Sequence, residues 1–144
     1  MTKEEYLVYM SHFNNKEYDK LSDFFSDDLI VEYYDKFILE KQTRRVLHGK
    51  QGFVDHYTKL HSTVREFLDL GFCLSDDENL VVELYTEFHA LEDTEFSAGR
   101  MKKGDAFCVT NWVCYNFSPD GKFNRIRIAH FIVHDTPPKF DPNS

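Results

Sequence analysis

The residues of this sequence best suited to chemistry are a histidine and a tyrosine on strand-like segments. His130 alternates with Ile126 and Ile128, which puts it on the apolar face of a C-terminal strand. Imidazole gains and loses a proton near neutral pH, so it can act as a general acid or base. Tyr33, on an earlier β-rich segment, can donate a hydrogen bond to a carbonyl or enolate oxygen. Together these two residue types predict proton transfer beside a carbonyl group.

Each of these residues also has an interpretation that involves no chemistry. His130 can be a core histidine with satisfied hydrogen bonds, or a residue of a pocket rim. Tyr33 can be one more aromatic wall residue in a chain with 14 Phe, 8 Tyr and 1 Trp. Asn111 shares a strand face with Val113 and Tyr115, and a buried amide needs partners, so it is a candidate for orienting a ligand.

The remaining histidines do not form a metal signature. His56 and His61 are five residues apart, whereas two ligands on one face of a helix are four apart. The sequence also has no phosphate-binding loop, dinucleotide-binding motif or Gly-x-Ser-x-Gly motif. We therefore expect neither a metal nor an organic cofactor.

Composition argues against several classes of protein. The chain has 144 residues, enough for one domain with its own core, and its formal net charge of -8 argues against nucleic acid or an anionic membrane as the main partner. No apolar run approaches the roughly 18 residues of a membrane-spanning helix, and the polar N-terminus does not resemble a secretory signal. The odd number of cysteines, three, argues against a disulfide framework. These features predict a cytoplasmic protein with reduced cysteines.

The elements that would position the candidate residues come in the order helices first, strands second. Apolar periodicity changes from about 3.6 to 2 near residue 65. This order predicts an α+β fold in which helices cover one face of a curved antiparallel sheet of about four to six strands. We expect one domain over residues 1–144, with a frayed tail at 136–144. Helices are predicted from the Thr2–Glu5 capping box onward, after Asn15 and over 50–63. Strands are predicted over 29–34, 66–74, 80–91, 105–117 and 122–134. The segment 36–48 can be strand or loop, and 92–104 is predicted to be an irregular connection.

Three features together resemble one fold family. They are the split N-terminal helix followed by the strand Asp28–Tyr34, Gly49 at the start of the third helix, and a closing hairpin with the sequence Asp-Gly-Lys-Phe-x-Arg-Ile-Arg-Ile. Over residues 3–134 the chain resembles the nuclear-transport-factor-2-like family, also called SnoaL-like, whose fold is a cystatin-like cone. The resemblance implies a deep pocket, lined in ketosteroid-isomerase-like members by the strand face of His130, and in many members a homodimer. The family includes cofactor-free isomerases, cyclases, dehydratases and epoxide hydrolases, and also binding proteins.

A closer local resemblance is to the scytalone dehydratases. Residues 12–21 and the following segment through Tyr33 align with that branch without gaps. The resemblance implies that Tyr33 helps to polarise a substrate carbonyl and that His89 is a pocket histidine. The helix tyrosine and aspartate of that branch are replaced here by Phe13 and Asn14, and its second histidine has no counterpart near residues 64–65. The chain resembles this branch but lacks part of its catalytic set.

The direction of His89 depends on the facing of its strand. If the apolar face with Leu80 and Leu84 points inward, His89 points to solvent or to a dimer partner. If the resemblance holds, Glu87 and His89 point inward, and a β-bulge could reverse the facing within the strand. We assign catalysis to His130, Tyr33 and His89, and substrate binding to Asn111, Tyr57, Glu87, Tyr115 and Ile128.

Two functions fit these observations. The first is a cofactor-free enzyme of polyketide-like or terpenoid-like small-molecule metabolism, including secondary metabolism, which isomerises, cyclises or dehydrates a small apolar carbonyl compound. The second is a non-catalytic small-molecule-binding or assembly module. The enzyme needs at least two polar side chains that converge in an open cavity, and we favour it. Trp112, Cys114, Arg125 and Arg127 on the convex face predict a homodimer.

Overall fold

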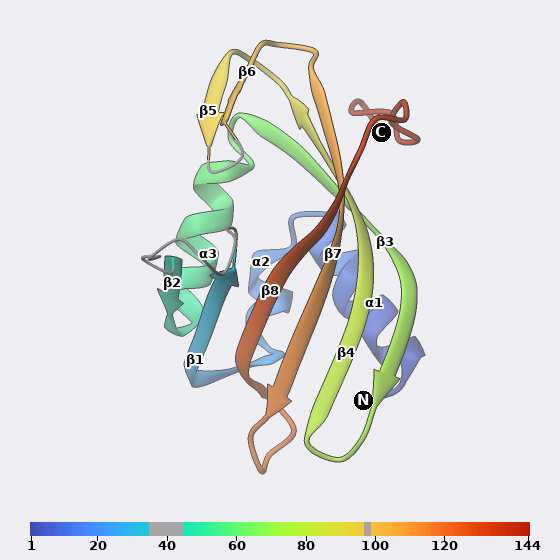
Figure 1. The fold of residues 1–144 in the computed structure, drawn as a ribbon. Coiled ribbons are helices and arrows are strands. Elements are labelled where there is room, and N and C mark those ends of the chain that lie inside the picture. The colour runs from blue at the N-terminus through green and yellow to red at the C-terminus, as the bar shows by residue number, and fades with distance from the viewer. Residues whose placement is uncertain (35–44, 97–98) are drawn as a thin grey trace.

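The computed structural model describes residues 1–34, 45–96 and 99–144, and within them it shows a curved sheet packed against three helices (Figure 1). The helices are α1 (Lys3–Asn14), α2 (Tyr18–Ser22) and α3 (Gly49–Leu60). The predicted capping box starts α1, because the Thr2 hydroxyl accepts from the Glu5 backbone N–H and the Glu5 carboxylate accepts from the Thr2 N–H. None of the helices in these residues is both long and apolar enough to cross a membrane.

The main sheet has six strands within the described residues, in the order β2-β1-β8-β7-β4-β3. The segment 92–104, predicted to be irregular, instead contains a small separate hairpin of β5 and β6. Of the segment 36–48, only β2 lies within the described residues. The strands are β1 (Phe25–Tyr34), β2 (Arg45–His48), β3 (Val64–Ser75), β4 (Asn79–Ala90), β5 (Thr94–Phe96), β6 (Gly99–Met101), β7 (Ala106–Phe117) and β8 (Phe123–His134).

The sheet is mixed and not antiparallel throughout as predicted, because β1 runs parallel to β8 while the other neighbours in the main sheet are antiparallel. The predicted β7–β8 hairpin forms, and Gly121 in its turn has a φ of 81°, in the left-handed region that glycine adopts without strain. The parallel pairing brings Tyr33 of β1 opposite Ile128 of β8. The predicted fold class, an α+β cone, is confirmed.

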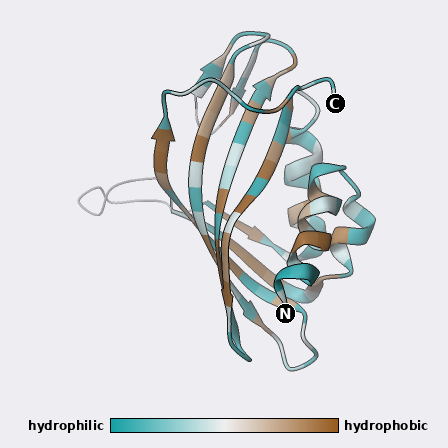
Figure 2. Ribbon diagram, turned by 90° about the vertical axis from the view of Figure 1, so that its right-hand side faces the viewer, coloured by the Kyte–Doolittle hydropathy of each residue, from teal (hydrophilic) through white to brown (hydrophobic). Residues whose placement is uncertain are grey.

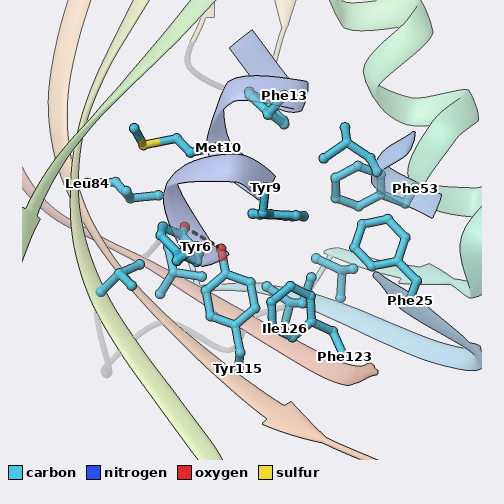
Figure 3. Packing of buried hydrophobic residues seen from close by; sticks show 14 of the residues in the cluster. Tyr6, Tyr9, Met10, Phe13, Phe25, Phe53, Leu84, Tyr115, Phe123 and Ile126 are labelled. Atoms are coloured by element: carbon cyan, nitrogen blue, oxygen red, sulfur yellow. Dashed lines mark hydrogen bonds between the residues drawn. The ribbon is translucent and has the colours of Figure 1, made fainter. Parts of the chain in front are cut away.

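Aromatic side chains fill the space between α1 and the sheet (Figure 3). Tyr9 of α1 packs edge-on against Phe123 of β8, with ring centroids 5.2 Å apart. The hydroxyls of Tyr6 and Tyr115 share a hydrogen bond of 2.8 Å, so both phenols keep a polar partner although they are buried. This layer closes one end of the cone and leaves the space between α3 and the rest of the sheet unfilled.

The outer face of the sheet carries the C-terminal segment. After β8 the chain crosses the sheet toward its C-terminus (Figure 2). The backbone N–H groups of Lys139 and Phe140 donate to the carboxylate of Glu87, at 2.6 and 3.1 Å. The ring of Phe140 stacks on Phe67 of β3, with centroids 5.2 Å apart. The segment is therefore anchored at two points on the outer face.

Candidate active site

A cavity of about 740 Å3 lies between the concave face of the sheet and α3. Its wall is mainly apolar and includes the rings of Phe13, Phe53, Phe88 and Phe107. Residues of helices and of strands form this wall, and α3 presents its apolar face to the sheet. Six of the eight residues predicted for the site line this cavity: His130, Tyr33, Asn111, Tyr57, Tyr115 and Ile128.

His130 of β8 is held by an amide on the neighbouring strand. The two residues face each other in the β7–β8 register, and Nδ1 of His130 lies 2.6 Å from Oδ1 of Asn111. Nδ2 of Asn111 donates in turn to Oγ1 of Thr86 on β4, at 3.2 Å. Because a carbonyl oxygen only accepts, Nδ1 carries the proton, and in the neutral ring the basic lone pair is then on Nε2. The amide thus selects both the tautomer and the orientation of the imidazole.

Two phenols form the second polar feature of the cavity. The hydroxyls of Tyr33 on β1 and Tyr57 on α3 are 2.7 Å apart and share a hydrogen bond. The guanidinium of Arg45 lies over the Tyr33 ring, 3.9 Å from its centroid. Burial, and then the neighbouring Tyr33, raise the pKa of Tyr57 well above its ordinary value, so this phenol stays protonated. The pair can donate a hydrogen bond to an oxygen that develops negative charge.

The strand pairing brings these two features together. Tyr33 lies opposite Ile128, and His130 is two residues farther along the same face of β8. Neighbouring strands are about 4.8 Å apart and residues on one face repeat every ~6.6 Å, so the Cα atoms of Tyr33 and His130 are roughly 8 Å apart. Both side chains line the same cavity, and His130 lies exposed at its rim.

Tyr115 and Ile128 also line the cavity, in different ways. The hydroxyl of Tyr115 is bonded to Tyr6, and its pKa is raised well above the ordinary value, by burial first and by Tyr6 next. Tyr115 is therefore part of the aromatic layer at the closed end. Ile128 contributes an apolar surface between Tyr33 and His130.

Glu87 and His89 lie outside the cavity, which corrects the inward facing that the resemblance implied. The alternation of β4 continues without a bulge in its pairing with β7, so Thr86 and Phe88 face the cavity and Glu87 and His89 face outward. Nε2 of His89 lies 2.7 Å from Oε1 of Glu87 beneath the C-terminal segment. The other facing considered, with the apolar face of Leu84 inward, is the one observed.

The polar residues of the cavity wall that were not predicted for the site include Thr86, His56 and Glu66. Thr86 follows Leu84 by two residues, so the alternation in the sequence already put the two side chains on the same face of the strand. His56 lies three residues after Phe53 on the apolar face of α3, and its ring packs against Tyr57. Burial, then the charge of Arg45, lowers the pKa of His56 to about 4, so the ring is neutral at pH 7. Glu66 lies on β3.

The described residues also contain no group of three or more His, Cys, Asp or Glu side chains placed to hold a metal ion. The polar side chains of the cavity wall are instead spread over α3 and the strands β1, β2, β3, β4, β5, β7 and β8. They engage one another in pairs and short chains of hydrogen bonds, as described above.

No family model matches this sequence, and no curated protein matches it. Solved structures match over most of the chain. A SnoaL-like polyketide cyclase from Agrobacterium tumefaciens str. C58 aligns over 90% of this chain and 88% of its own, with 18% identity and a TM-score of 0.63. SalBIII, an epoxide hydrolase/cyclase-like enzyme of pyran ring formation in the polyether salinomycin, aligns over 90% of both chains with 13% identity and a TM-score of 0.65.

A third structure is a protein from Mycobacterium tuberculosis in complex with estradiol-17β-hemisuccinate. It aligns over 83% of this chain and 85% of its own, with 12% identity and a TM-score of 0.63. At these identities the likeness establishes a shared fold and leaves the activity open. The chain shares the fold of SnoaL-like polyketide cyclases.

Proposed function

We propose that the chain is a cofactor-free enzyme that moves protons beside the carbonyl group of a small apolar molecule, and thereby isomerises, cyclises or dehydrates it. The observation that carries this proposal is the convergence of two polar features in one cavity. An imidazole held in a single tautomer and a hydrogen-bonded pair of phenols line it from neighbouring strands and from α3. These are the two parts that proton transfer next to a carbonyl requires.

The roles follow from the donors and acceptors. Nε2 of His130 removes a proton from the carbon beside the carbonyl, and the electrons of that C–H bond form an enolate. The carbonyl oxygen takes up the negative charge, which Tyr33 and Tyr57 stabilise by donating a hydrogen bond. The protonated imidazole then returns the proton to another atom of the substrate, so the step balances without an oxidant or reductant.

The cavity wall supports an apolar, ring-containing substrate. Its volume of about 740 Å3 lies within the range of small-molecule sites, roughly 300–1,000 Å3, and its wall is mainly aromatic and aliphatic. One solved structure of the same fold is a complex with estradiol-17β-hemisuccinate, and another is a computationally designed 17-OHP binder. We infer a polycyclic, prenylated or polyketide-like ligand with a carbonyl group, and a role in secondary metabolism.

A passive binding protein is the second candidate. The designed 17-OHP binder has the same fold and, by its name, a binding purpose. His130 is exposed at the rim, where water competes for its hydrogen bonds. A passive protein would use the same apolar wall and bind its ligand without reaction.

The test needs no knowledge of the natural substrate. The fused-ring ketone 2-tetralone has acidic protons beside its carbonyl, and their exchange for deuterium is followed by proton NMR in deuterated buffer. We expect the protein to accelerate this exchange and His130→Ala to lower the acceleration by about 10²–10⁴, the usual contribution of one general acid–base group. If 2-tetralone binds but its protons exchange at the rate seen in buffer, the protein is a passive binding protein and not an enzyme of this kind.

We also propose a homodimer that forms through the outer face of the sheet. Trp112 and Phe131 stack there with ring centroids 4.3 Å apart, and 41% and 54% of their surfaces are exposed. Together with the neighbouring exposed Ile132 they form an apolar patch of the kind that marks protein interfaces. The predicted cytoplasmic location agrees with the three free cysteines and remains a prediction.

A further inference from the structure

Glu66 is a buried carboxylate in the wall of the cavity. It lies on β3 opposite Phe88 of β4, and Leu68, two residues on, also lines the cavity. Only 6% of its surface is exposed. Burying a carboxylate costs free energy unless hydrogen bonds offset the loss of water. Packing alone would be served better by an apolar residue here, so the arrangement around Glu66 calls for a functional explanation.

A histidine and a tyrosine extend from Glu66 toward the surface. Nε2 of His61, just after α3, lies 3.1 Å from Oε1 of Glu66, and both side chains are buried. Nδ1 of His61 lies 2.7 Å from the hydroxyl of Tyr18, a half-buried residue at the start of α2. When Tyr18 donates to Nδ1, the neutral ring carries its proton on Nε2 and donates it to Glu66. The three groups form a continuous chain of hydrogen bonds.

The packing around His61 fixes this chain in place. Phe13 contacts the imidazole edge-on with ring centroids 5.4 Å apart, and Tyr57 lies 5.5 Å from it. Burial, and next the charge of Glu66, raise the pKa of Tyr18, which therefore holds its proton. The second carboxylate oxygen of Glu66, Oε2, receives no hydrogen bond from any described residue, and Glu66 lines the cavity. One oxygen is anchored and the other remains for a ligand.

We propose that Glu66 is a second acid–base group of the cavity, positioned by His61 and supplied with protons from the surface through Tyr18. This proposal rests on the proposed function and deepens it. A proton passes between Oε2 and an oxygen of the ligand, and the shift of one proton along each hydrogen bond of the chain restores Glu66. Tyr18 exchanges the last proton with water, so no other reactant is needed.

The distance between the two acid–base groups indicates the substrate. His130 is on β8 and Glu66 on β3, with β7 and β4 between them. Three strand spacings of about 4.8 Å give roughly 14 Å across the strands, and the register adds an offset of four residues, about 13 Å, along them. The two positions are therefore roughly 20 Å apart in the plane of the sheet and closer across its curved wall. A single carbonyl group cannot reach both. The substrate class is therefore an extended or fused-ring molecule with a ketone near His130 and a hydroxyl or second carbonyl oxygen near Glu66.

The experiment uses a probe that reports a base in an apolar cavity. A base removes the C3 proton of 5-nitrobenzisoxazole, the N–O bond breaks, and its electron pair goes to oxygen, which gives a coloured phenolate. A carboxylate shielded from water is a stronger base for such a proton than a hydrated one. We expect Glu66→Gln to lower kcat/KM for this probe at least tenfold and to change 2-tetralone exchange less than threefold.

His130→Ala should show the converse, with loss of 2-tetralone exchange and less than a threefold change with 5-nitrobenzisoxazole. Failure of the proposed function would appear in the 2-tetralone data, and failure of the Glu66 proposal in the 5-nitrobenzisoxazole data. The matched control is Glu92→Gln, an exposed carboxylate, which should leave both reactions unchanged. Thermal unfolding of each variant establishes that it is folded, and Glu66→Asp, which keeps the charge, is the second variant if Glu66→Gln does not fold.

The positioning role of His61 has its own readout. His61→Ala removes the donor to Oε1 and should lower kcat/KM for 5-nitrobenzisoxazole about as much as Glu66→Gln does. His61→Gln should recover part of the loss, because its amide can donate to the same oxygen. The proposal is wrong if folded Glu66→Gln keeps wild-type activity on 5-nitrobenzisoxazole. It is equally wrong if Glu66→Gln lowers both reactions to the same extent, since Glu66 would then have a structural role only.

Discussion

Nδ1 of His130 lies 2.6 Å from Oδ1 of Asn111, so a buried amide on β7 selects the tautomer of a histidine at the cavity rim. Asn111 is oriented in turn by Thr86, and only 6% of its surface is exposed. The exposed residue that would exchange protons with the substrate is therefore held by residues that solvent does not reach. This arrangement keeps Nδ1 of the imidazole pointed at the amide oxygen and fixes the direction of Nε2.

Asn111→Leu should weaken the acid–base function of His130 without unfolding the protein. The ring then loses a hydrogen bond worth about 1 kcal/mol, which corresponds to roughly five- to tenfold in rate. We expect 2-tetralone exchange to fall by that factor, and the ¹⁵N spectrum of His130 to change from one tautomer to a mixture. Thr86→Val, which removes only the support of Asn111, should have a smaller effect. An unchanged ¹⁵N spectrum in Asn111→Leu would show that the amide does not select the tautomer.

Removal of one phenol hydroxyl should lower the rate of 2-tetralone exchange more than it lowers binding. Tyr33→Phe and Tyr57→Phe each remove one member of the pair that we propose stabilises the enolate oxygen, and such donors contribute about 10²–10³ in rate. The double variant should be little worse than either single one, because the pair acts as a unit. Tyr115→Phe is the control, since its hydroxyl is bonded to Tyr6. Additive losses would indicate two independent donors.

The facing of side chains could be predicted from the sequence, whereas the neighbours of each strand could not. Alternation put His130 and Asn111 on inner faces, and both line the cavity. It also offered the outward facing of His89 that the structure shows, against the inward facing implied by resemblance. Alternation says which way a residue points along one strand, and it holds whether or not a relative has the same catalytic set.

The pairing of Tyr33 with β8 needed the structure. Parallel pairs join strands that are far apart in the chain, and here the strands β2 to β7 come between β1 and β8 in the sequence. No local pattern marks such a pair. Glu66 was missed for another reason. It shares a strand face with Leu68, but a carboxylate is ordinarily a surface residue, and the sequence did not show that His61 would be its buried partner.

The neutral state of His56 should make stability fall in mild acid. The unfolded histidine titrates near ~6.5 and the folded one at about 4, so the unfolded state binds more protons between these values and stability is lost as pH falls through this window. His56 is half-buried, and solvent screening reduces the effect below the limit of about 1.4 kcal/mol per pH unit.

We expect urea unfolding to show that wild type loses about 1 kcal/mol more between pH 7 and pH 5 than His56→Gln does. The variant keeps a polar side chain that cannot take up a proton in this range. His48→Gln is the matched control, because His48 is exposed. Equal losses in wild type and His56→Gln would mean that His56 titrates normally in the folded protein.

The apolar patch on the outer face should hold two chains together. Wild type is expected to sediment with twice the 17.1 kDa mass of the chain at micromolar concentration. Trp112→Glu introduces a charge at the centre of the patch and should give a monomer with an intact fold. Leu7→Glu, a comparable exposed apolar residue on α1, should leave the dimer unchanged. A wild-type monomer at this concentration would contradict the proposed dimer.

The last prediction concerns Glu87, which binds the C-terminal segment to the sheet. Its carboxylate is fully buried and accepts four hydrogen bonds: Oε2 from Tyr85 and the Lys139 N–H, and Oε1 from His89 and the Phe140 N–H. Burial would raise the pKa of Glu87, but these donors, first the Lys139 N–H, together lower it. Glu87→Gln cannot replace the carboxylate, because its NH₂ group would face two donors whichever way the amide is turned.

We expect Glu87→Gln to lower the free energy of unfolding by about 2 kcal/mol and to release the segment, so that trypsin cleaves after Lys139 much faster than in wild type. Because the folded-state pKa is lowered, the stabilisation is complete above the unfolded value of about 4.3 and is lost as pH falls through the folded-state pKa, where wild type and variant should converge. The control is Glu95→Gln, whose exposed carboxylate pairs with exposed Arg100. In either case 2-tetralone exchange should be unchanged, since Glu87 lies outside the cavity. Equal rates of trypsin cleavage for wild type and Glu87→Gln would show that Glu87 does not hold the segment.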